Sequence, residues 1–213
     1  MSAEFDYIRD PADIYRQSFA TIREEVDLSN LSKGMEAVFV RLIHACGMVD
    51  LMQDIAYSEG AYEAGTEALR SGAPVFVDVE MVAHGIIRRL LPAGNEVICM
   101  LNDTRVRPHA AEIGNTRSAA QVDFWNDRLE GAVVAIGNAP TALFRLLENI
   151  AAGGPKPALI LGFPVGFVGA AESKELLIRS RTVPYIAVRG RRGGSAMAAA
   201  AVNALGGGLG ANV

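Results

Sequence analysis

The sequence predicts an α/β fold: an open, doubly wound parallel sheet of about five strands in a three-layer arrangement with flanking helices. From about residue 75 onward, short runs rich in Val, Ile, Phe and Tyr alternate with helical patterns, and Gly, Pro or Asn bound each run. These runs lack polar alternation, so helices should cover both faces of each strand. Strand–helix alternation of this kind favours right-handed crossovers within a single sheet.

Each expected element follows from its local pattern. The apolar runs expected to form strands span 75–79, 96–101, 132–136, 158–161 and 185–188. The expected helices carry apolar residues at intervals of three and four. They span 12–26, 35–57, 61–70, 82–90, 117–129, 141–151, 171–181 and 195–205.

Glycines add detail to two of these helices. Gly47 lies inside the expected 35–57 helix, where glycine costs about 1 kcal/mol, so it indicates close approach by a ligand or another backbone. Gly153 and Gly154 precede Pro155, which is typical of a helix that ends with glycine at a left-handed cap and proline beyond it.

Composition places the chain among folded globular proteins. Its 213 residues suit one domain, expected over 1–205, followed by a Gly-rich tail at 206–213 that we expect to be flexible. Half of the residues are hydrophobic and 21% are charged, which excludes a disordered chain. The 20 Lys and Arg residues against 24 Asp and Glu residues form no basic cluster, so nucleic acid is not an expected partner. Cys46 and Cys99 cannot form a multi-bridge scaffold, and they lack the C-x-x-C spacing of structural zinc sites.

The apolar runs do not predict a membrane span, which needs roughly 20 predominantly apolar residues. The run 157–171 is too short and is broken by proline and glycine, while 193–213 is mostly alanine and glycine. The first residues, MSAEFDYIRDP, carry early acids and no apolar segment of a signal peptide. We therefore expect a cytoplasmic protein with no membrane partner.

Three junctions between an expected strand and the following helix are rich in glycine and small polar residues: 136–141, 162–174 and 189–195. In such sheets, ligands bind at the carboxyl ends of the strands. Glycines there let backbone N–H groups approach a ligand, and a helix N-terminus favours an anion. Tight turns that merely close the crossovers are the alternative for any single junction. Three together, two of them with lysine or arginine, favour an extended polyanionic ligand.

Neither ATP nor NAD is expected at these junctions. Residues 169–174 (GAAESK) lack the G-K-[ST] order of a phosphate-binding loop. The glycines from 206 onward precede no helix, so they cannot form a dinucleotide fingerprint.

His44 lies on the apolar stripe of its expected helix. A lone histidine there is more often a satisfied core residue than a catalyst, and the residues by themselves leave both readings open. Cys46 and Asp50 fall on other helix faces, so they do not complete a metal site with it. His84 and His109 are weaker candidates.

Arg117 is expected in a first helical turn, where the helix dipole disfavours a cation unless it meets negative charge. A surface ion pair or a bound anion would each explain it. Arg16 and Ser18 lie on an amphipathic helix and would alone be ordinary surface residues.

Six ordered segments resemble the precorrin-8X methylmutase family, the isomerases of cobalamin (vitamin B12) biosynthesis. The resemblance runs from Tyr7 to about Leu205. The segments are 43–48 (IHACGM), 78–85 (DVEMVAHG), 115–118 (NTRS), 137–143 (GNAPTAL), 164–174 (PVGFVGAAESK) and 190–195 (GRRGGS).

The resemblance implies a homodimer with a flavodoxin-like fold and an active site built from both subunits. It implies conversion of precorrin-8X to hydrogenobyrinate by moving a methyl group from C-11 to C-12 of the macrocycle. His44 would be the acid catalyst, and Ser18 and Arg117 would bind the ring and a carboxylate. No metal or organic cofactor is implied, because the rearrangement is redox-neutral. Together with the junctions, the expected substrate-binding residues are Arg16, Ser18, Thr116, Arg117, Asn138, Thr141, Gly166, Ser173, Lys174, Arg191, Gly193, Gly194 and Ser195.

Three other functions stay open at this point. A cobalt-precorrin-8 methylmutase of the anaerobic branch would share the motifs, although the residues in them are more similar to those of the metal-free, aerobic branch. A corrinoid-binding or carrier protein would share product binding without turnover. A sugar-phosphate or nucleotide enzyme would use the same anion-binding junctions.

Overall fold

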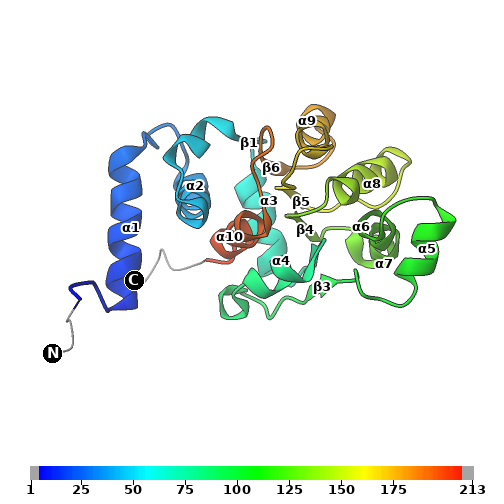
Figure 1. The fold of residues 1–213 in the computed structure, drawn as a ribbon, viewed down its shortest axis with the longest axis horizontal. Helices are drawn as coiled ribbons and strands as arrows, with labels where there is room; N and C mark the ends of the chain where they lie inside the picture. The colour runs from blue at the N-terminus through cyan, green and yellow to red at the C-terminus, as the bar shows by residue number, and fades with distance from the viewer. Residues whose placement is uncertain (1–4, 208–213) are drawn as a thin grey trace.

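The computed structural model describes residues 5–207 and places a six-stranded sheet between helices on both of its faces (Figure 1). The strand order is β1-β6-β5-β4-β2-β3; β1 runs antiparallel to β6, and every other neighbouring pair is parallel. Counted among themselves, the five parallel strands have the 2-1-3-4-5 order of flavodoxin-like folds. The predicted α/β class is confirmed. The strands are β1 (Ile55–Tyr57), β2 (Val75–Val77), β3 (Val97–Cys99), β4 (Val133–Ile136), β5 (Leu159–Gly162) and β6 (Tyr185–Val188).

Most predicted helices are present with boundaries close to those expected from periodicity. Side-chain caps explain two of the starts, because Asp10 accepts a hydrogen bond from Asp13 N and Ser32 accepts one from Met35 N. The helices are α1 (Pro11–Glu25), α2 (Lys33–Cys46), α3 (Ala61–Arg70), α4 (Glu80–Gly85), α5 (Val106–Glu112), α6 (Arg117–Ala120), α7 (Asn126–Leu129), α8 (Pro140–Ala151), α9 (Ala170–Ser180) and α10 (Ser195–Leu205), with 3-10 turns η1 (Val49–Asp54), η2 (Arg88–Leu90) and η3 (Gln121–Trp125).

Alternate residues of each strand face two separate cores. Val133 and Ala135 of β4 pack with α2, α3, α4 and α10, whereas Val134 and Ile136 pack with η3, α8 and α9. Figure 1 shows these two helix layers on opposite sides of the sheet, with α1 outside α2. Because both faces of the strands are covered, continuous apolar runs rather than alternating ones mark them in the sequence.

The single helix predicted over 35–57 is wrong. Gly47 adopts a left-handed conformation (φ 68°) and donates to Ile43 O at 2.7 Å, which ends α2 at Cys46. The chain then forms η1 and the edge strand β1, which was not predicted. Gly47 has no protein neighbour within 4 Å of a would-be Cβ, so the expected close approach of another backbone is wrong, while approach of a ligand stays a prediction. The glycine serves as a helix cap.

Three other segments differ from the prediction in detail. The expected 82–90 helix is the short α4 followed by η2, the expected 117–129 helix is broken into α6, η3 and α7, and α5 was not predicted. Gly153 has φ 89°, which confirms the predicted left-handed glycine after α8. Of the predicted flexible tail, residues 208–213 lie outside the described residues. Within 5–207, no helix combines the length and apolar character needed to cross a membrane.

Helix α10 lies at the centre of one helix layer, and its alanines allow neighbours to approach closely. It contacts α2, α3, α4 and the strands β4 and β5. A Cβ on Gly85 of α4 would lie 2.7 Å from the Cβ of Ala199, and a Cβ on Gly137 would lie 3.0 Å from that of Ala198. Small side chains on both partners therefore set the distance between α10 and the turn after β4.

We expect Ala198→Leu to lower the free energy of unfolding by about 1–3 kcal/mol, because three extra carbons enter a closely packed contact. The matched control is Ala196→Leu on the exposed face of the same helix, for which we expect a change within about 0.5 kcal/mol. Denaturant unfolding measures both. Equal effects for the two variants would contradict the close packing of α10 against Gly137.

Candidate active site

The carboxyl ends of β2 and β4 mark the point where the strand order reverses direction. In open α/β sheets, ligands bind in the crevice at this switch point. The expected junctions after β4, β5 and β6 all end at the same edge of the sheet, because these strands are parallel. The structure thus brings most predicted site residues to one edge.

Asp78, directly after β2, joins the two sides of the switch point. Its carboxylate accepts hydrogen bonds from the backbone N–H groups of Gly137 (2.9 Å), Asn138 (2.9 Å) and Ala139 (2.7 Å). The side chain is fully buried. Burial raises the pKa of this carboxyl, and the three N–H donors oppose that rise. The anion site expected from the backbone of this turn is therefore already occupied by a carboxylate of the protein itself.

Hydroxyl and guanidinium groups lie beside this turn. Thr116 caps α6 by accepting from Ala119 N, and its Oγ1 lies 2.8 Å from Oγ1 of Thr141. Arg117 is exposed, and its Nη2 donates to Leu101 O and to Asn102 Oδ1, each at 2.9 Å. Both of these partners are uncharged, so the guanidinium charge remains available to an anionic ligand.

The junctions after β5 and β6 are bonded to each other. Gly194 N donates to Phe163 O at 2.8 Å, and Gly166 N donates to Arg191 O at 3.2 Å. A Cβ on Gly193 would lie 2.3 Å from Phe163 O, so only glycine fits there. Ser195, the buried first residue of α10, is equally close to the switch point, because its Cα lies 2.7 Å from a would-be Cβ of Gly137.

Ser173 and Lys174 face the protein interior rather than a ligand. Both side chains are fully buried. Ser173 donates to Ala170 O at 3.2 Å, and Lys174 Nζ donates to Arg192 O at 2.5 Å. Burial lowers the pKa of Lys174 to about 8. The structure therefore does not favour the predicted contact of these two residues with substrate; Lys174 instead supports the junction that carries Arg191.

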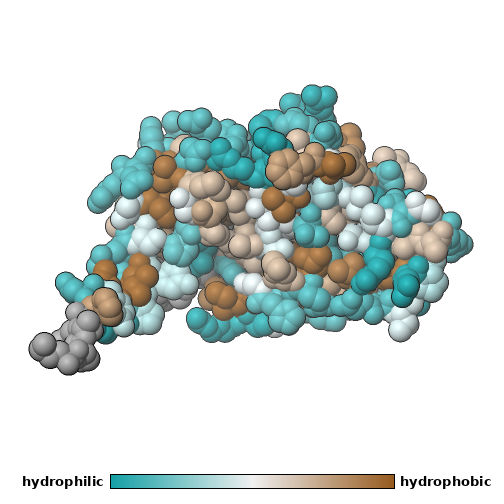
Figure 2. All heavy atoms as spheres, in the orientation of Figure 1, coloured by the Kyte–Doolittle hydropathy of each residue, from teal (hydrophilic) through white to brown (hydrophobic). Residues whose placement is uncertain are grey.

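A hollow of about 400 Å³ opens beside these junctions. Its walls are mainly apolar, from Met48, Val165, Phe167 and Met197, with Arg191 at the rim. The Arg191 guanidinium lies 5.1 Å from the centroid of the Phe167 ring. Figure 2 shows several apolar side chains among polar ones on the face of the molecule seen in Figure 1.

His44 lies in the last turn of α2, four residues before Met48 of the hollow. Its Nδ1 lies 2.8 Å from Ser18 Oγ on α1. The rings of Tyr15 and Phe19 each have centroids 5.3 Å from the imidazole centroid. Burial lowers the pKa of His44, and the charge of Arg41 lowers it further. The imidazole is thus oriented by a hydroxyl and is held between two aromatic rings.

Arg16 is the predicted site residue least integrated with the others, because it is exposed and forms an ion pair with Asp13 of its own helix. Sequence reasoning gave no role to Asp78 or Arg41. The position of Asp78 directly after a buried strand could have indicated its role. The position of Arg41 within the apolar face of a helix could have indicated the other.

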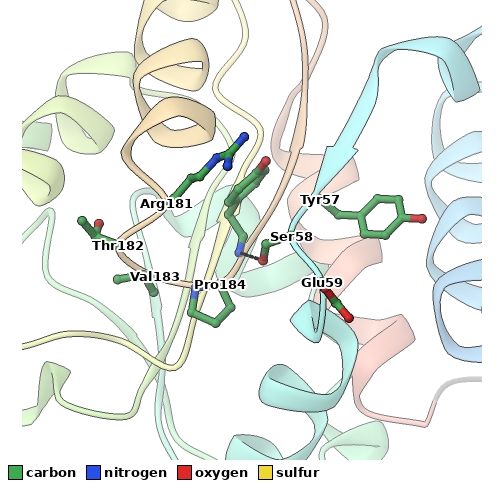
Figure 3. Close-up of a pocket in the computed structure, with 8 residues that line it drawn as sticks. Tyr57, Ser58, Glu59, Arg181, Thr182, Val183 and Pro184 are labelled. Carbon is green, nitrogen blue, oxygen red and sulfur yellow. Dashed lines mark hydrogen bonds between the residues drawn. The ribbon is translucent and has the colours of Figure 1, made fainter.

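A hollow of about 470 Å³ lies at the amino end of β6, opposite the candidate site (Figure 3). Figure 3 shows Arg181 on one wall and Tyr57 and Glu59 on the other, with Ser58 bonded to the backbone of Tyr185. Among residues 5–207, no group of three or more His, Cys, Asp or Glu side chains is placed to hold a metal ion.

The sheet order and the site together define a flavodoxin-like α/β protein with a hydrogen-bonded histidine, two arginines that contact uncharged groups, and an apolar hollow. A family model described as "Precorrin-8X methylmutase" matches residues 13–207, and the chain belongs to that family of isomerases. The predicted family is confirmed.

Named relatives and a solved structure agree with this family. A Pseudomonas aeruginosa protein named "Precorrin-8X methylmutase" is 63% identical, over 94% of this chain and 97% of its own. A Salmonella typhimurium protein named "Cobalt-precorrin-8 methylmutase" is 41% identical, over 93% of this chain and 96% of its own. The structure of a precorrin-8X methylmutase from Thermus thermophilus has a TM-score of 0.83 and 38% identity, covering 91% of this chain and 94% of its own.

We expect Asp78→Asn to lower the free energy of unfolding by about 1–3 kcal/mol, because an amide N–H₂ would face backbone donors that now meet carboxylate oxygen. Asp127→Asn, at an exposed site on α7, is the matched control and should change it by less than about 0.5 kcal/mol. Thermal and denaturant unfolding measure both variants. An Asp78→Asn variant that is as stable as the unaltered protein would refute the role of this carboxylate at the switch point.

Proposed function

We propose that this protein converts precorrin-8X to hydrogenobyrinate by moving a methyl group from C-11 to C-12 of the macrocycle, with His44 as the acid. The observation that carries the proposal is the hydrogen bond between Ser18 and His44, four residues before Met48, which lines an apolar hollow together with Arg191. Family membership supplies the substrate class.

The Ser18 contact determines which imidazole nitrogen can act. If the hydroxyl donates to Nδ1, a neutral His44 carries its hydrogen on Nε2; if the ring is charged, both nitrogens carry hydrogen and Nδ1 donates to the hydroxyl. In either state Nε2 is the donor available to a ring nitrogen of the substrate. Proton donation makes the conjugated macrocycle electron-poor, and that lowers the barrier to methyl migration.

The walls of the site suit a large, flat and anionic ligand. Met48, Phe167 and Met197 offer apolar surface to the face of a ring. Arg191 lines this hollow, and Arg117 lies beside the turn after β4. Arginine can hold a carboxylate through two hydrogen bonds. Arg192 is less available, because its Nη2 lies 2.7 Å from Asp50. Holding the macrocycle in a reactive conformation would supply the rest of the rate enhancement.

We include a homodimer in the proposal. Phe167 is 85% exposed and Val168 is 89% exposed, next to the hollow. Exposed apolar side chains of this size at a site support coverage by another surface, and a second copy of the chain would cover both sites symmetrically. We also propose that residues up to Leu205 form a single domain, because both cores share one sheet.

The metal-free substrate is favoured over the cobalt-containing one. Identity is 63% to the relative named for precorrin-8X and 41% to the relative named for cobalt-precorrin-8. The proposed reaction needs no cofactor, because it is redox-neutral. Cys46 and Cys99 are both free and partly buried, which supports a reducing compartment such as the cytoplasm.

We expect His44→Ala to lower kcat by about 10²–10⁴ while product affinity changes little, because the lost group donates a proton without forming the hollow. Turnover is followed by the change in the visible spectrum of the macrocycle, and product binding by titration. His84→Ala is the control, since this side chain is 82% exposed on α4. Full activity in His44→Ala would overturn the mechanism, and product binding without turnover in the unaltered protein would favour a carrier.

We expect Arg117→Ala to weaken hydrogenobyrinate binding about tenfold to a hundredfold, the value of one hydrogen bond to a charged group. Arg128→Ala, which removes an exposed arginine paired with Glu96, should leave the affinity unchanged. Unchanged affinity in Arg117→Ala would remove the carboxylate contact from the proposal but leave the reaction in place.

A further inference from the structure

Arg41 is a buried cation one helical turn before His44. Its side chain is 8% exposed, and it lies in the contact between α2 and α1 with its guanidinium 5.6 Å from the Phe19 ring centroid. Its Nη2 is buried without a hydrogen-bond partner among the described residues. A buried guanidinium with an unmet donor is costly, so its presence calls for a physical reason.

His44 shares the surroundings of Arg41. Residues three apart on a helix are neighbours on its surface, and Phe19 packs against both side chains. No carboxylate of residues 5–207 forms an ion pair with either group. From α1, the Ser18 hydroxyl bonds to His44 and the titratable Tyr15 packs its ring against the imidazole.

The other elements packed against α2 add no compensating charge at His44. Helix α10 carries no ionisable residue. Helix α3 contacts α2 through Tyr62, which lies against Gly34 at the end of α2 far from His44. After α2, the acids Asp50 and Asp54 face Arg192.

A fixed positive charge beside an imidazole raises the free energy of the imidazolium, and more so where water is excluded. Arginine cannot relieve this by losing its own proton. The direction of the pKa shift of His44 agrees with this geometry, because burial and the charge of Arg41 both lower that pKa. An acid catalyst that is uncharged in the free protein needs a source of protonation when the substrate arrives, and a ligand with several carboxylates supplies compensating negative charge.

We propose that Arg41 is a positioning residue for the proposed reaction: its charge keeps the His44 ring neutral in the free protein, so that the ring takes up a proton from solvent only when a polycarboxylate occupies the hollow. One proton enters per site, and no other group changes its charge. Acid catalysis is thereby restricted to anionic ligands. The part that concerns the ligand rests on the proposed function; the part that concerns the free protein does not.

The first experiment titrates the histidine side chains of the free protein by NMR. The chain has three histidines, so His84→Gln and His109→Gln variants assign the signals. Arg41→Met removes the charge but keeps an unbranched, buried side chain, and Arg41→Lys keeps the charge. Arg23→Met is the matched control, because it removes an exposed arginine from the same helix pair, where Arg23 binds Glu36 at 2.6 Å.

We expect Arg41→Met to raise the proton affinity of His44 roughly tenfold, the effect of one neighbouring charge, while Arg41→Lys and Arg23→Met stay close to the unaltered protein. Equal titration of His44 in Arg41→Met and the unaltered protein would overturn the proposal. If Arg41→Met does not fold, Arg41→Gln removes the same charge with a polar side chain, and unchanged titration of His44 in that variant would overturn the proposal.

The second experiment measures proton uptake when hydrogenobyrinate binds, by calorimetry at neutral pH in buffers of different ionisation enthalpy. We expect uptake approaching one proton per site in the unaltered protein and less in Arg41→Met. Binding without uptake would overturn the coupling to ligand charge. Failure of hydrogenobyrinate to bind at all would refute the proposed function instead, and the histidine titration of the free protein would still test Arg41.

Discussion

The carboxylate of Asp78 holds together the edge of the sheet on which the candidate site lies. Its three bonds to the turn after β4 join the two halves of the sheet where the strand order reverses. That turn in turn contacts the start of α10, where Gly137 meets Ser195 without room for a side chain. The neighbouring junctions are then positioned by backbone bonds such as that between Gly194 and Phe163. The shape of the hollow thus depends on one internal anion.

This internal anion also changes how a ligand would be recognised. Backbone N–H groups at a switch point commonly bind a phosphate or carboxylate of the ligand. Here a protein carboxylate meets them, so anion recognition falls to side chains. Arg192 and Arg16 are neutralised by nearby acids, whereas Arg117 and Arg191 contact uncharged groups. In the proposed function, these two cations would meet the carboxylates of the ligand, and the apolar surface of the hollow would meet its ring.

A low proton affinity of His44 in the free protein is compatible with acid catalysis if ligand binding raises that affinity again. A weakly basic imidazole, once protonated, is a stronger acid and gives up its proton more readily. Placement between Tyr15 and Phe19 restricts the ring, and Ser18 orients it. Burial of Arg41 in the same contact makes the charge of the ring sensitive to the charge of its ligand. The α1–α2 contact therefore combines orientation with control of protonation.

Local patterns determined the five parallel strands and most helices, because their periodicity depends only on near neighbours and on which faces are covered. Even the end of α2 was readable in Gly47, although a helix was expected to continue. The tertiary structure decided the rest. Strand β1 exists because it pairs with β6, about 130 residues away, and the bond between Ser18 and His44 joins two helices. Lys174 and Asp78 carry charges whose roles depend on what lies opposite them. A sequence determines which groups are present, but burial and partners arise only when distant segments meet.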